Sequence, residues 1–249
     1  LDQLVIDAGE AGKEFHPGAV TGERTGPRRF GRRKILQGKR KLAMSNAIKI
    51  HRFPLSGHCH RVELFSSLTG INYELVEVDL ANGEHKRDPF LKLNPVGLVP
   101  VIEDGSTVLS DSNAILVYLA RKYAPDWLPT DPYLEAEVHR FLAFAAGELA
   151  SGPGAARLIT VFGRPLDPER AKSVAKVAFD NLEAHLDGRE WLVGDRPTIA
   201  DIAIYSYTAH APEGNVSLEP YPRIRGLLKR IEDLPGFVAM PATKAGLAA

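Results

Sequence analysis

The segment of residues 125–132, which begins and ends with proline, divides this chain into two parts of different character. Before it, short apolar runs of the strand type alternate with helical patterns, whereas every strong pattern after it is helical. Three prolines within eight residues end the preceding helix and are typical of a linker between domains. The sequence therefore predicts an α/β domain over residues 46–124, a linker over 125–132 and an all-helical domain over 133–249.

The α/β part is predicted to contain a small mixed sheet. A first strand ends near Phe53-Pro54, and the helix that follows it stops at Gly70. Asp104-Gly105 lies between two apolar runs, which is a strong signal for a β-hairpin. Two parallel strands joined by a crossover helix, followed by an antiparallel pair, give a mixed sheet with helices on its faces. The predicted strands are 48–53, 73–78, 99–102 and 107–109.

Helical periodicity accounts for most of the remaining structure. Ile115, Leu116 and Leu119 share one face of a predicted helix that ends before Pro125. Thr198 and Asp201 have the spacing of a capping box, which we interpret as structural. Loops rich in Gly and Pro are expected between the helices of the second part. The predicted helices are 112–123, 133–149, 168–186, 198–209 and 221–234, with a single turn around 89–93 and another near the C-terminal end.

The first 43 residues differ from the rest in charge. Residues 1–43 hold ten Lys and Arg against five Asp and Glu, and residues 24–41 carry nine basic residues and no acidic one. Their low apolar content, with their Gly and charge content, predicts a disordered extension, or a start upstream of the one that natural translation uses. An arm attracted to nucleic acid or to a membrane is the alternative interpretation.

Charge and cysteine usage exclude several classes of protein. The formal net charge is zero, so the chain after the basic extension is slightly acidic and does not indicate a nucleic-acid-binding body. No apolar run approaches the roughly 20 residues that span a bilayer. Cys59 is the only cysteine, which excludes an internal disulfide and argues against a cysteine-rich metal site. We therefore expect no metal, no nucleic-acid partner and no membrane, and a reducing, cytoplasmic compartment.

A serine lies at the junction between the first strand and the first helix. The N-terminus of a helix presents unpaired backbone N–H groups and a partial positive charge, so it favours an anion beside it. A hydroxyl that donates a hydrogen bond to a thiolate bound there would lower the pKa of the thiol. Two interpretations of Ser56 therefore stand side by side: it caps the helix, or it activates a bound thiol.

Three further segments carry residues suited to a peptide-like ligand. Pro100 enters a predicted strand, where a cis peptide bond would turn the backbone of Val99 outward to pair with an extended ligand; otherwise Pro100 simply begins the strand. Asp111 and Ser112 either cap the next helix or meet the ammonium and carboxylate groups of an amino acid. The stretch 83–86, Gly-Glu-His-Lys, is a solvated loop or a pair of cationic donors for a second carboxylate.

The joint order of these segments is more specific than any one of them. Strand, Pro-x-Ser, helix, Gly-Glu-His-Lys, Asn-Pro-x-Gly-x-Val-Pro and Asp-Ser together resemble the N-terminal domain of glutathione transferases, nearest to the serine-using phi- and theta-like groups and their bacterial relatives. The resemblance continues through residues 191–201, WLVGDRPTIAD, and covers about residues 46–240. It implies a thioredoxin-like domain with a four-stranded mixed sheet that binds glutathione, followed by an all-helical domain.

The resemblance also implies roles for individual residues. Ser56 matches the serine whose hydroxyl hydrogen-bonds the glutathione thiolate, and Val99, before the cis Pro100, matches the residue that pairs with the cysteinyl part. Asp111 and Ser112 match the pair that holds the γ-glutamyl end.

Two further matches concern the glycyl end of glutathione. His85 and Lys86 match positions that reach the glycyl carboxylate in phi-like enzymes. Leu98 departs from the pattern, because those enzymes often carry a polar side chain there.

Cys59 and four residues of the helical part have weaker signals. Ser56 and Cys59 occupy the places of the two cysteines in a thioredoxin-like redox motif, so Cys59 is either a small packed side chain or the site of a mixed disulfide with glutathione. A zinc site at residues 58–60 is a remote alternative, since adjacent residues on a helix point in different directions. A second-substrate pocket is predicted to be bordered by Phe141, Phe144, Glu148 and Arg157.

Three functions remain open from the sequence. The first is a glutathione transferase, in which the glutathione thiol attacks a small electrophile, a detoxification chemistry. The second is a glutathione-dependent peroxidase or thiol reductase, which would depend on Cys59. The third is a non-catalytic binding module on the same fold. The resemblance also suggests a symmetric homodimer.

Overall fold

The structure, a computed structural model, describes residues 47–249, and the predicted extension over 1–43 lies outside this range. The α/β part has a four-stranded sheet with the order β2-β1-β3-β4, as predicted. β1 pairs with β2 in parallel, and β3 is antiparallel to both β1 and β4. The strands are β1 Ile48–Arg52, β2 Tyr73–Glu77, β3 Val101–Asp104 and β4 Thr107–Ser110.

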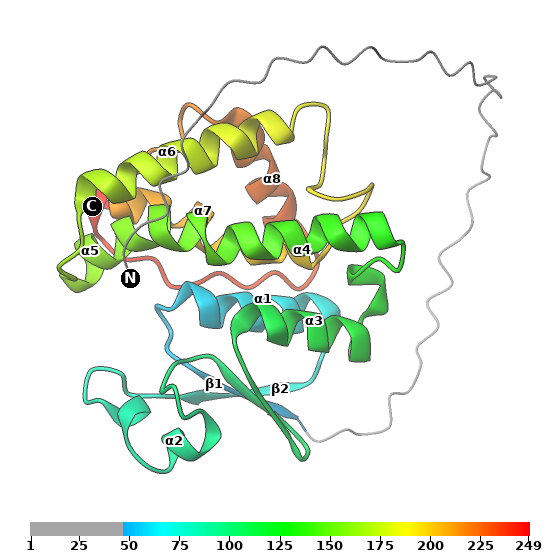
Figure 1. Ribbon diagram of the computed structural model, residues 1–249, viewed down its shortest axis with the longest axis vertical. Helices are drawn as coiled ribbons and strands as arrows, with labels where there is room; N and C mark the ends of the chain where they lie inside the picture. Colours follow the sequence, from blue (N-terminus) through cyan, green and yellow to red (C-terminus); the bar gives the residue numbers. More distant parts are fainter. Residues whose placement is uncertain (1–46) are drawn as a thin grey trace, which may run out of the picture. The chain divides into compact units, whose positions relative to one another are not determined.

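Alternate residues of the strands separate two apolar clusters on opposite faces of the sheet. Ile50 of β1 and Ile102 of β3 face the main core, together with Phe65 from α1 (Gly57–Thr69) and Leu116 from α3 (Ser112–Tyr123). Val101, the neighbour of Ile102, faces a smaller cluster under α2 (Phe90–Leu93). Figure 1 shows α1 and α3 on one side of the sheet and α2 on the other.

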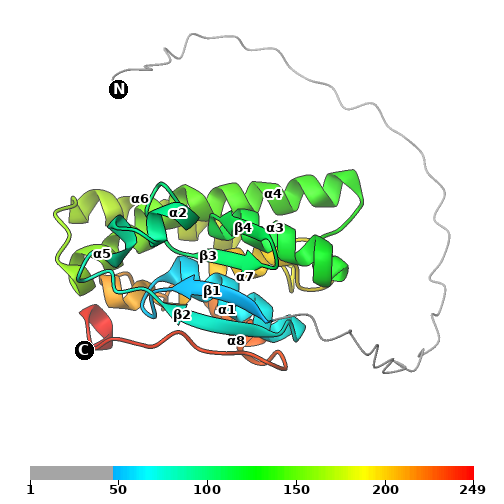
Figure 2. The ribbon, with the colours of Figure 1, turned by 90° about the horizontal axis from the view of Figure 1, so that it is seen from below.

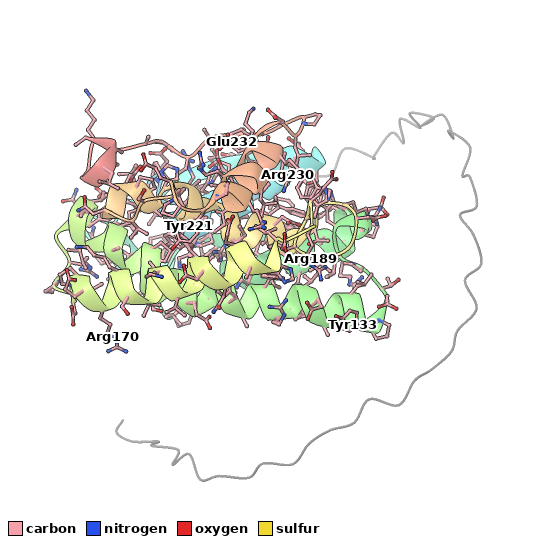
Figure 3. The ribbon with its side chains drawn as sticks, turned by 90° about the horizontal axis from the view of Figure 1, so that it is seen from above. Tyr133, Arg170, Arg189, Tyr221, Arg230 and Glu232 are labelled. Carbon is pink, nitrogen blue, oxygen red and sulfur yellow. The ribbon has the colours of Figure 1, made fainter. Side chains whose placement is uncertain are left out.

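The second part of the chain is helical. α7 lies at its centre, and all of its residues up to Thr208 are buried, in contact with α1, α3 and α4. Phe179 of α6 packs on Tyr221 at the N-terminus of α8, with ring centroids 5.5 Å apart; Figure 3 labels Tyr221. The helices are α4 Pro132–Ala146, α5 Ala155–Phe162, α6 Pro168–His185, α7 Ile199–Ala209 and α8 Pro222–Glu232.

The C-terminal segment ties the two parts together. It follows α8 and runs back along α1 toward the end of the molecule where α5 lies (Figure 2). Ser67 Oγ donates to the Gly236 carbonyl at 2.6 Å, and the ring of His60 lies 2.9 Å from the Val238 carbonyl. The predicted capping box of α7 is confirmed. The Thr198 side chain accepts a backbone N–H from the first turn of α7, and the Asp201 side chain accepts the backbone N–H of Thr198.

Two local predictions need correction. The first concerns residues 150–162, which were expected to be loop. They form a π-helical turn, Ala150–Gly154, followed by α5; Gly152 packs so closely on Ala175 that a Cβ there would lie 2.8 Å from the Ala175 nitrogen. The second is the start of β3, which is Val101 rather than residue 99.

The segment 125–132 contains a 3₁₀ turn, Pro125–Trp127, and the first residue of α4. Its role as a linker, like the domain boundaries on either side, remains a prediction. Among the helices of residues 47–249, none combines the length and the apolar composition needed to cross a bilayer.

Candidate active site

The sheet register brings the predicted site segments to one end of the sheet. His51 near the end of β1 pairs with Val101 at the start of β3, and Val101 pairs with Ser110 at the end of β4. The loop after β1, the residues before β3 and the loop after β4 therefore lie at the same end of the sheet. These segments carry Ser56, Val99 with Pro100, and Asp111 with Ser112.

Ser56 is the N-cap of α1. Its backbone is extended, and its Oγ accepts the N–H of Cys59 at 3.4 Å, which confirms the capping interpretation. A hydroxyl that accepts one hydrogen bond still has its own proton to donate. Capping and a hydrogen bond to a thiolate are therefore compatible, and the second remains a prediction.

The loop that precedes Ser56 is held from the helical part. Arg157 of α5 donates through Nη1 to the Leu55 carbonyl at 2.7 Å and through Nε to Glu213 at 2.7 Å. Both members of this ion pair are almost fully buried, with side-chain exposures of 2% and 3%. Arg157 was predicted to border the second-substrate pocket. Its guanidinium is buried between the loop and Glu213, with Cζ 5.7 Å from the centre of the Phe162 ring, and its role at that pocket remains a prediction.

Glu213 anchors several segments at once. Besides Arg157, it lies 2.7 Å from the ring of His210 and accepts the N–H and the hydroxyl of Thr243 at 3.0 and 2.8 Å. Desolvation by itself raises the pKa of this carboxyl, but the hydrogen bonds from His210, Thr243 and Arg157 outweigh it and lower the pKa to about 2. Glu213 is therefore a carboxylate that links the C-terminal segment to the Ser56 loop.

The three residues 58–60 have separate surroundings. His58 Nδ1 lies 3.3 Å from Ser112 Oγ, and His60 Nδ1 lies 2.9 Å from Ser206 Oγ. Burial lowers the pKa of both imidazoles to about 4, so both are neutral at pH 7. Across residues 47–249, His, Cys, Asp and Glu side chains form no group of three placed to hold a metal ion.

Cys59 is a packed side chain. It is 1% exposed, and its Sγ accepts the N–H of Phe53 at 3.4 Å. Burial raises the pKa of its thiol to about 11, although hydrogen bonds from Ser56 and Phe53 act in the opposite direction. Because reactive cysteines are accessible and have a lowered pKa, this environment favours the packing interpretation over the redox one.

Val99 lies on an open stretch of backbone. Its peptide bond to Pro100 is cis, as is the bond between Asp88 and Pro89, for which the sequence held no sign. No backbone hydrogen bond of Val99 is formed within residues 47–249, and the preceding Leu98 is 58% exposed. This N–H and this carbonyl are thus free to pair with an extended ligand.

The N-terminus of α3 carries the candidate amino-acid-binding pair. Asp111 is the N-cap, and its carboxylate accepts the N–H groups of Asn113 and Ala114 at 3.0 and 2.9 Å. Its φ of 72° is rare for a residue with a side chain, and such conformations cost roughly 1–3 kcal/mol and cluster at functional sites. Ser112 is buried, with Oγ accepting from Arg61.

Lys86 and His85 lie in a 3₁₀ turn, Glu84–Lys86, next to the segment before Val99. The Lys86 ammonium donates to the carbonyls of Val96 and Gly97 at 3.1 and 2.9 Å, which leaves one of its three protons uncommitted. Nδ1 of His85 is buried and has no hydrogen-bond partner within the described residues.

Three of the four predicted second-substrate residues line one cavity. Phe141, Phe144 and Glu148 line a cavity of about 460 Å³ between α4 and α6, and no residue of the α/β part lines it. Nearer to Ser56, the ring of Phe162 from α5 lies 6.1 Å from that of Phe53 and is 37% exposed.

Sequence reasoning missed two residues of this region. Phe162 belongs to a helix that was not predicted. Arg61 belongs to a predicted helix, and its only signal was a charged residue directly before the apolar Val62. Neither signal identifies the partner of the side chain, which lies far away in the sequence.

Comparisons with known families cover most of the described chain. The family model "Glutathione S-transferase, N-terminal domain" matches residues 55–122, and "Glutathione S-transferase, C-terminal domain" matches residues 163–235. A curated relative, Glutathione S-transferase 2 of Anopheles gambiae, is 31% identical over 190 residues, which are 75% of this chain and 91% of that protein.

Solved structures give the same result. The glutathione S-transferase of Pseudomonas fluorescens is 34% identical with a TM-score of 0.72, over 78% of this chain and 98% of that one. A glutathione transferase homologue from Drosophila mojavensis, described with bound glutathione, is 28% identical with a TM-score of 0.70, over 76% of this chain and 89% of that one.

Proposed function

This chain belongs to the glutathione S-transferase family, and on that premise we propose that Ser56 activates the thiol of bound glutathione for attack on a small electrophile. The observation that carries the proposal is the register of β1, β3 and β4, which gathers Ser56, Val99 and Ser112 around the N-terminus of α1. The bound glutathione in the Drosophila mojavensis structure supports glutathione as the co-substrate.

The Ser56 hydroxyl donates to the sulfur while its oxygen continues to accept the N–H of Cys59. The positive end of α1 adds to this stabilisation of the thiolate. Each unit by which the thiol pKa falls corresponds to about 1.4 kcal/mol of preference for the thiolate. The thiol proton leaves to solvent, and the ionised sulfur is the nucleophile.

The ends of glutathione are held by three groups of residues. The free backbone of Val99 pairs with the cysteinyl unit. Asp111 meets the γ-glutamyl ammonium and Ser112 its carboxylate. The uncommitted proton of Lys86, with His85 beside it, serves the glycyl carboxylate.

The second substrate lies against the exposed ring of Phe162 and the half-buried ring of Phe53, close to the Ser56 loop. The thiolate forms a sulfur–carbon bond as the carbon loses its leaving group, or adds to an activated double bond. Two effects accelerate the reaction: the site holds both reactants close together, and it stabilises the thiolate.

A conjugation assay tests this function. The purified protein is given glutathione and an aryl halide, and the thioether product is followed. We expect Ser56→Ala to lower kcat by about a hundredfold, as the loss of one preorganised hydrogen-bond donor does in other sites. Ser106→Ala, a matched change in the loop between β3 and β4, is expected to have no effect. An unchanged kcat for thioether formation in Ser56→Ala would contradict the role of Ser56.

Three broader properties belong to the same proposal. We expect the two-domain division at residues 125–132, a symmetric homodimer and a cytoplasmic detoxification role. The cytoplasmic location is supported by the single, buried Cys59, because a free cysteine suits a reducing compartment.

A further inference from the structure

Arg61 of α1 is a buried cation that forms no ion pair with a carboxylate of residues 47–249. Its side chain is among the largest that are fully buried, and the residue is 1% exposed. Nη1 donates to Ser112 Oγ at 2.9 Å and to Asn113 Oδ1 at 2.8 Å, with His58 Nδ1 at 3.5 Å. Nε and Nη2 have no partner, and within residues 47–249 no ion pair involves this guanidinium.

Arg157, the other fully buried arginine, shows what is unusual about Arg61. Arg157 pairs with the carboxylate of Glu213, as a buried charge normally requires. An unpaired buried charge costs several kcal/mol. Burial lowers the pKa of Arg61 to about 10, but the group remains a cation at pH 7. The charge of Asp111 raises this pKa, but Asp111 forms no ion pair with Arg61, so residues 47–249 leave a buried and only partly compensated positive charge behind Ser112.

The hydrogen bond from Arg61 to Ser112 also restricts the direction in which the Ser112 hydroxyl can donate. A guanidinium can only donate, so Arg61 occupies an acceptor position of Ser112 Oγ and leaves the hydroxyl proton for another group. His58 Nδ1 is one acceptor, at the long distance of 3.3 Å. A carboxylate at the N-terminus of α3 is the stronger acceptor, because hydrogen bonds to charged oxygens are about twice as strong as neutral ones.

We propose that Arg61 is a positioning residue for glutathione: its charge draws the α-carboxylate of the γ-glutamyl group to the N-terminus of α3, and its hydrogen bond turns the Ser112 hydroxyl toward that carboxylate. The bound carboxylate then supplies a counter-charge for Arg61 in addition to the charge of Asp111. This inference rests on the proposed function, because it takes glutathione as the ligand.

The test compares two ligands on each protein. One is glutathione, and the other is 4-aminobutanoyl-cysteinylglycine, which lacks only the α-carboxylate of the γ-glutamyl group. In Arg61→Gln, which removes the charge but keeps a donor, we expect glutathione to bind about tenfold more weakly, equivalent to one charge-assisted hydrogen bond. The analogue should bind to this variant as it does to the unaltered protein, within about twofold. kcat at saturating glutathione should change little, so that the loss appears in KM.

Two further variants complete the test. Arg61→Lys keeps the charge and should keep most of the preference for glutathione over the analogue. Arg121→Gln removes a charge at the other end of α3 and should leave the preference unchanged. A merely structural role for Arg61 would lower the stability of both Arg61 variants and weaken the binding of both ligands equally.

The outcomes separate this inference from the proposed function. If the unaltered protein binds neither ligand, the proposed function fails and this inference with it. If it prefers glutathione and Arg61→Gln shows the same preference, only the inference is overturned. If Arg61→Gln does not fold, Arg61→Lys decides, since loss of the preference in this charged variant would overturn the proposal.

Discussion

At the scale of single residues, the first turn of α1 places three polar side chains in three environments. Ser56 is partly accessible and caps the helix, His58 faces Ser112, and Cys59 is buried against the backbone of Phe53. The helix N-terminus would favour a thiolate at any of these positions, but burial of Cys59 opposes ionisation more strongly. The thiolate that this end of the helix stabilises is therefore expected to come from the ligand.

Cys59 provides the first prediction. Because its thiol is buried with a pKa of about 11, it should react with a disulfide reagent at pH 8 far more slowly in the native protein than in urea. Cys59→Ala should retain glutathione conjugation. Reaction rates with the reagent, and kcat of the variant, give the measurement. Rapid labelling of the native protein, with loss of activity in Cys59→Ala, would favour the thiol reductase instead.

The sequence predicted those site residues that each belong to a local motif. Ser56 and Ser112 follow predicted strands and Val99 begins one, so their meeting at one end of the sheet could be expected. Arg61 and Arg157 could not be placed in the same way, because their partners lie 51 and 56 residues away or more. A buried guanidinium in a helical pattern looks like any exposed arginine until its neighbours are known.

At the scale of elements, short-range signals explain which boundaries were predictable. Gly70 ends α1 in a left-handed conformation, and Asp131 and Thr198 cap α4 and α7. α5 escaped prediction because the sequence Gly152-Pro153-Gly154 argues against a helix. The structure uses these glycines for close packing, with Gly154 against the ring of Tyr207.

The capping box of α7 gives a prediction for stability. Asp201 is fully buried and accepts the N–H groups of Thr198 and Leu192 at 2.8 and 3.0 Å. Thr198→Ala should lower the free energy of unfolding by about 1 kcal/mol, the usual loss of an N-cap. Asp201→Ala should cost more, about 2–4 kcal/mol, because it leaves two buried donors without an acceptor.

Urea unfolding measures both values. Since neither residue lies at the candidate site, kcat per folded molecule should stay unchanged in both variants. Equal losses of stability in the two variants would mean that the hydrogen bond from the Leu192 N–H to the Asp201 carboxylate contributes nothing.

The Glu213 cluster gives a prediction for pH. The folded-state pKa of Glu213 is lowered to about 2, so its carboxylate stabilises the fold fully above pH 4.5, its ordinary pKa, and the contribution is lost as the pH falls toward 2. This loss is worth up to about 3 kcal/mol. Glu213→Gln should be less stable at pH 7, and its stability should fall less between pH 4.5 and 2. Unfolding curves across this range that run parallel for both proteins would contradict this origin of the acid sensitivity.

At the scale of the whole molecule, exposed apolar side chains bear on assembly. Tyr133 at the start of α4 points outward (Figure 3) and is 70% exposed, and Val177 of α6 is 56% exposed. Isolated exposed residues of this kind are common, but they are also what a contact between subunits would cover. We expect a homodimer by sedimentation at micromolar concentration. Val177→Lys should weaken it if α6 lies in the contact, and a monomer for the unaltered protein at working concentration would contradict the expectation.

If Ser56 stabilises a bound thiolate, as we propose, the absorbance of the thiolate as a function of pH will report it. Glutathione is titrated with the unaltered protein, Ser56→Ala and Ser106→Ala at saturating protein. We expect a thiol pKa below the free value of about 8.5 in the unaltered protein and in Ser106→Ala, and a return toward that value in Ser56→Ala. Glutathione that binds to the unaltered protein with an unshifted thiol pKa, or with the same lowered pKa in Ser56→Ala, would contradict this proposal.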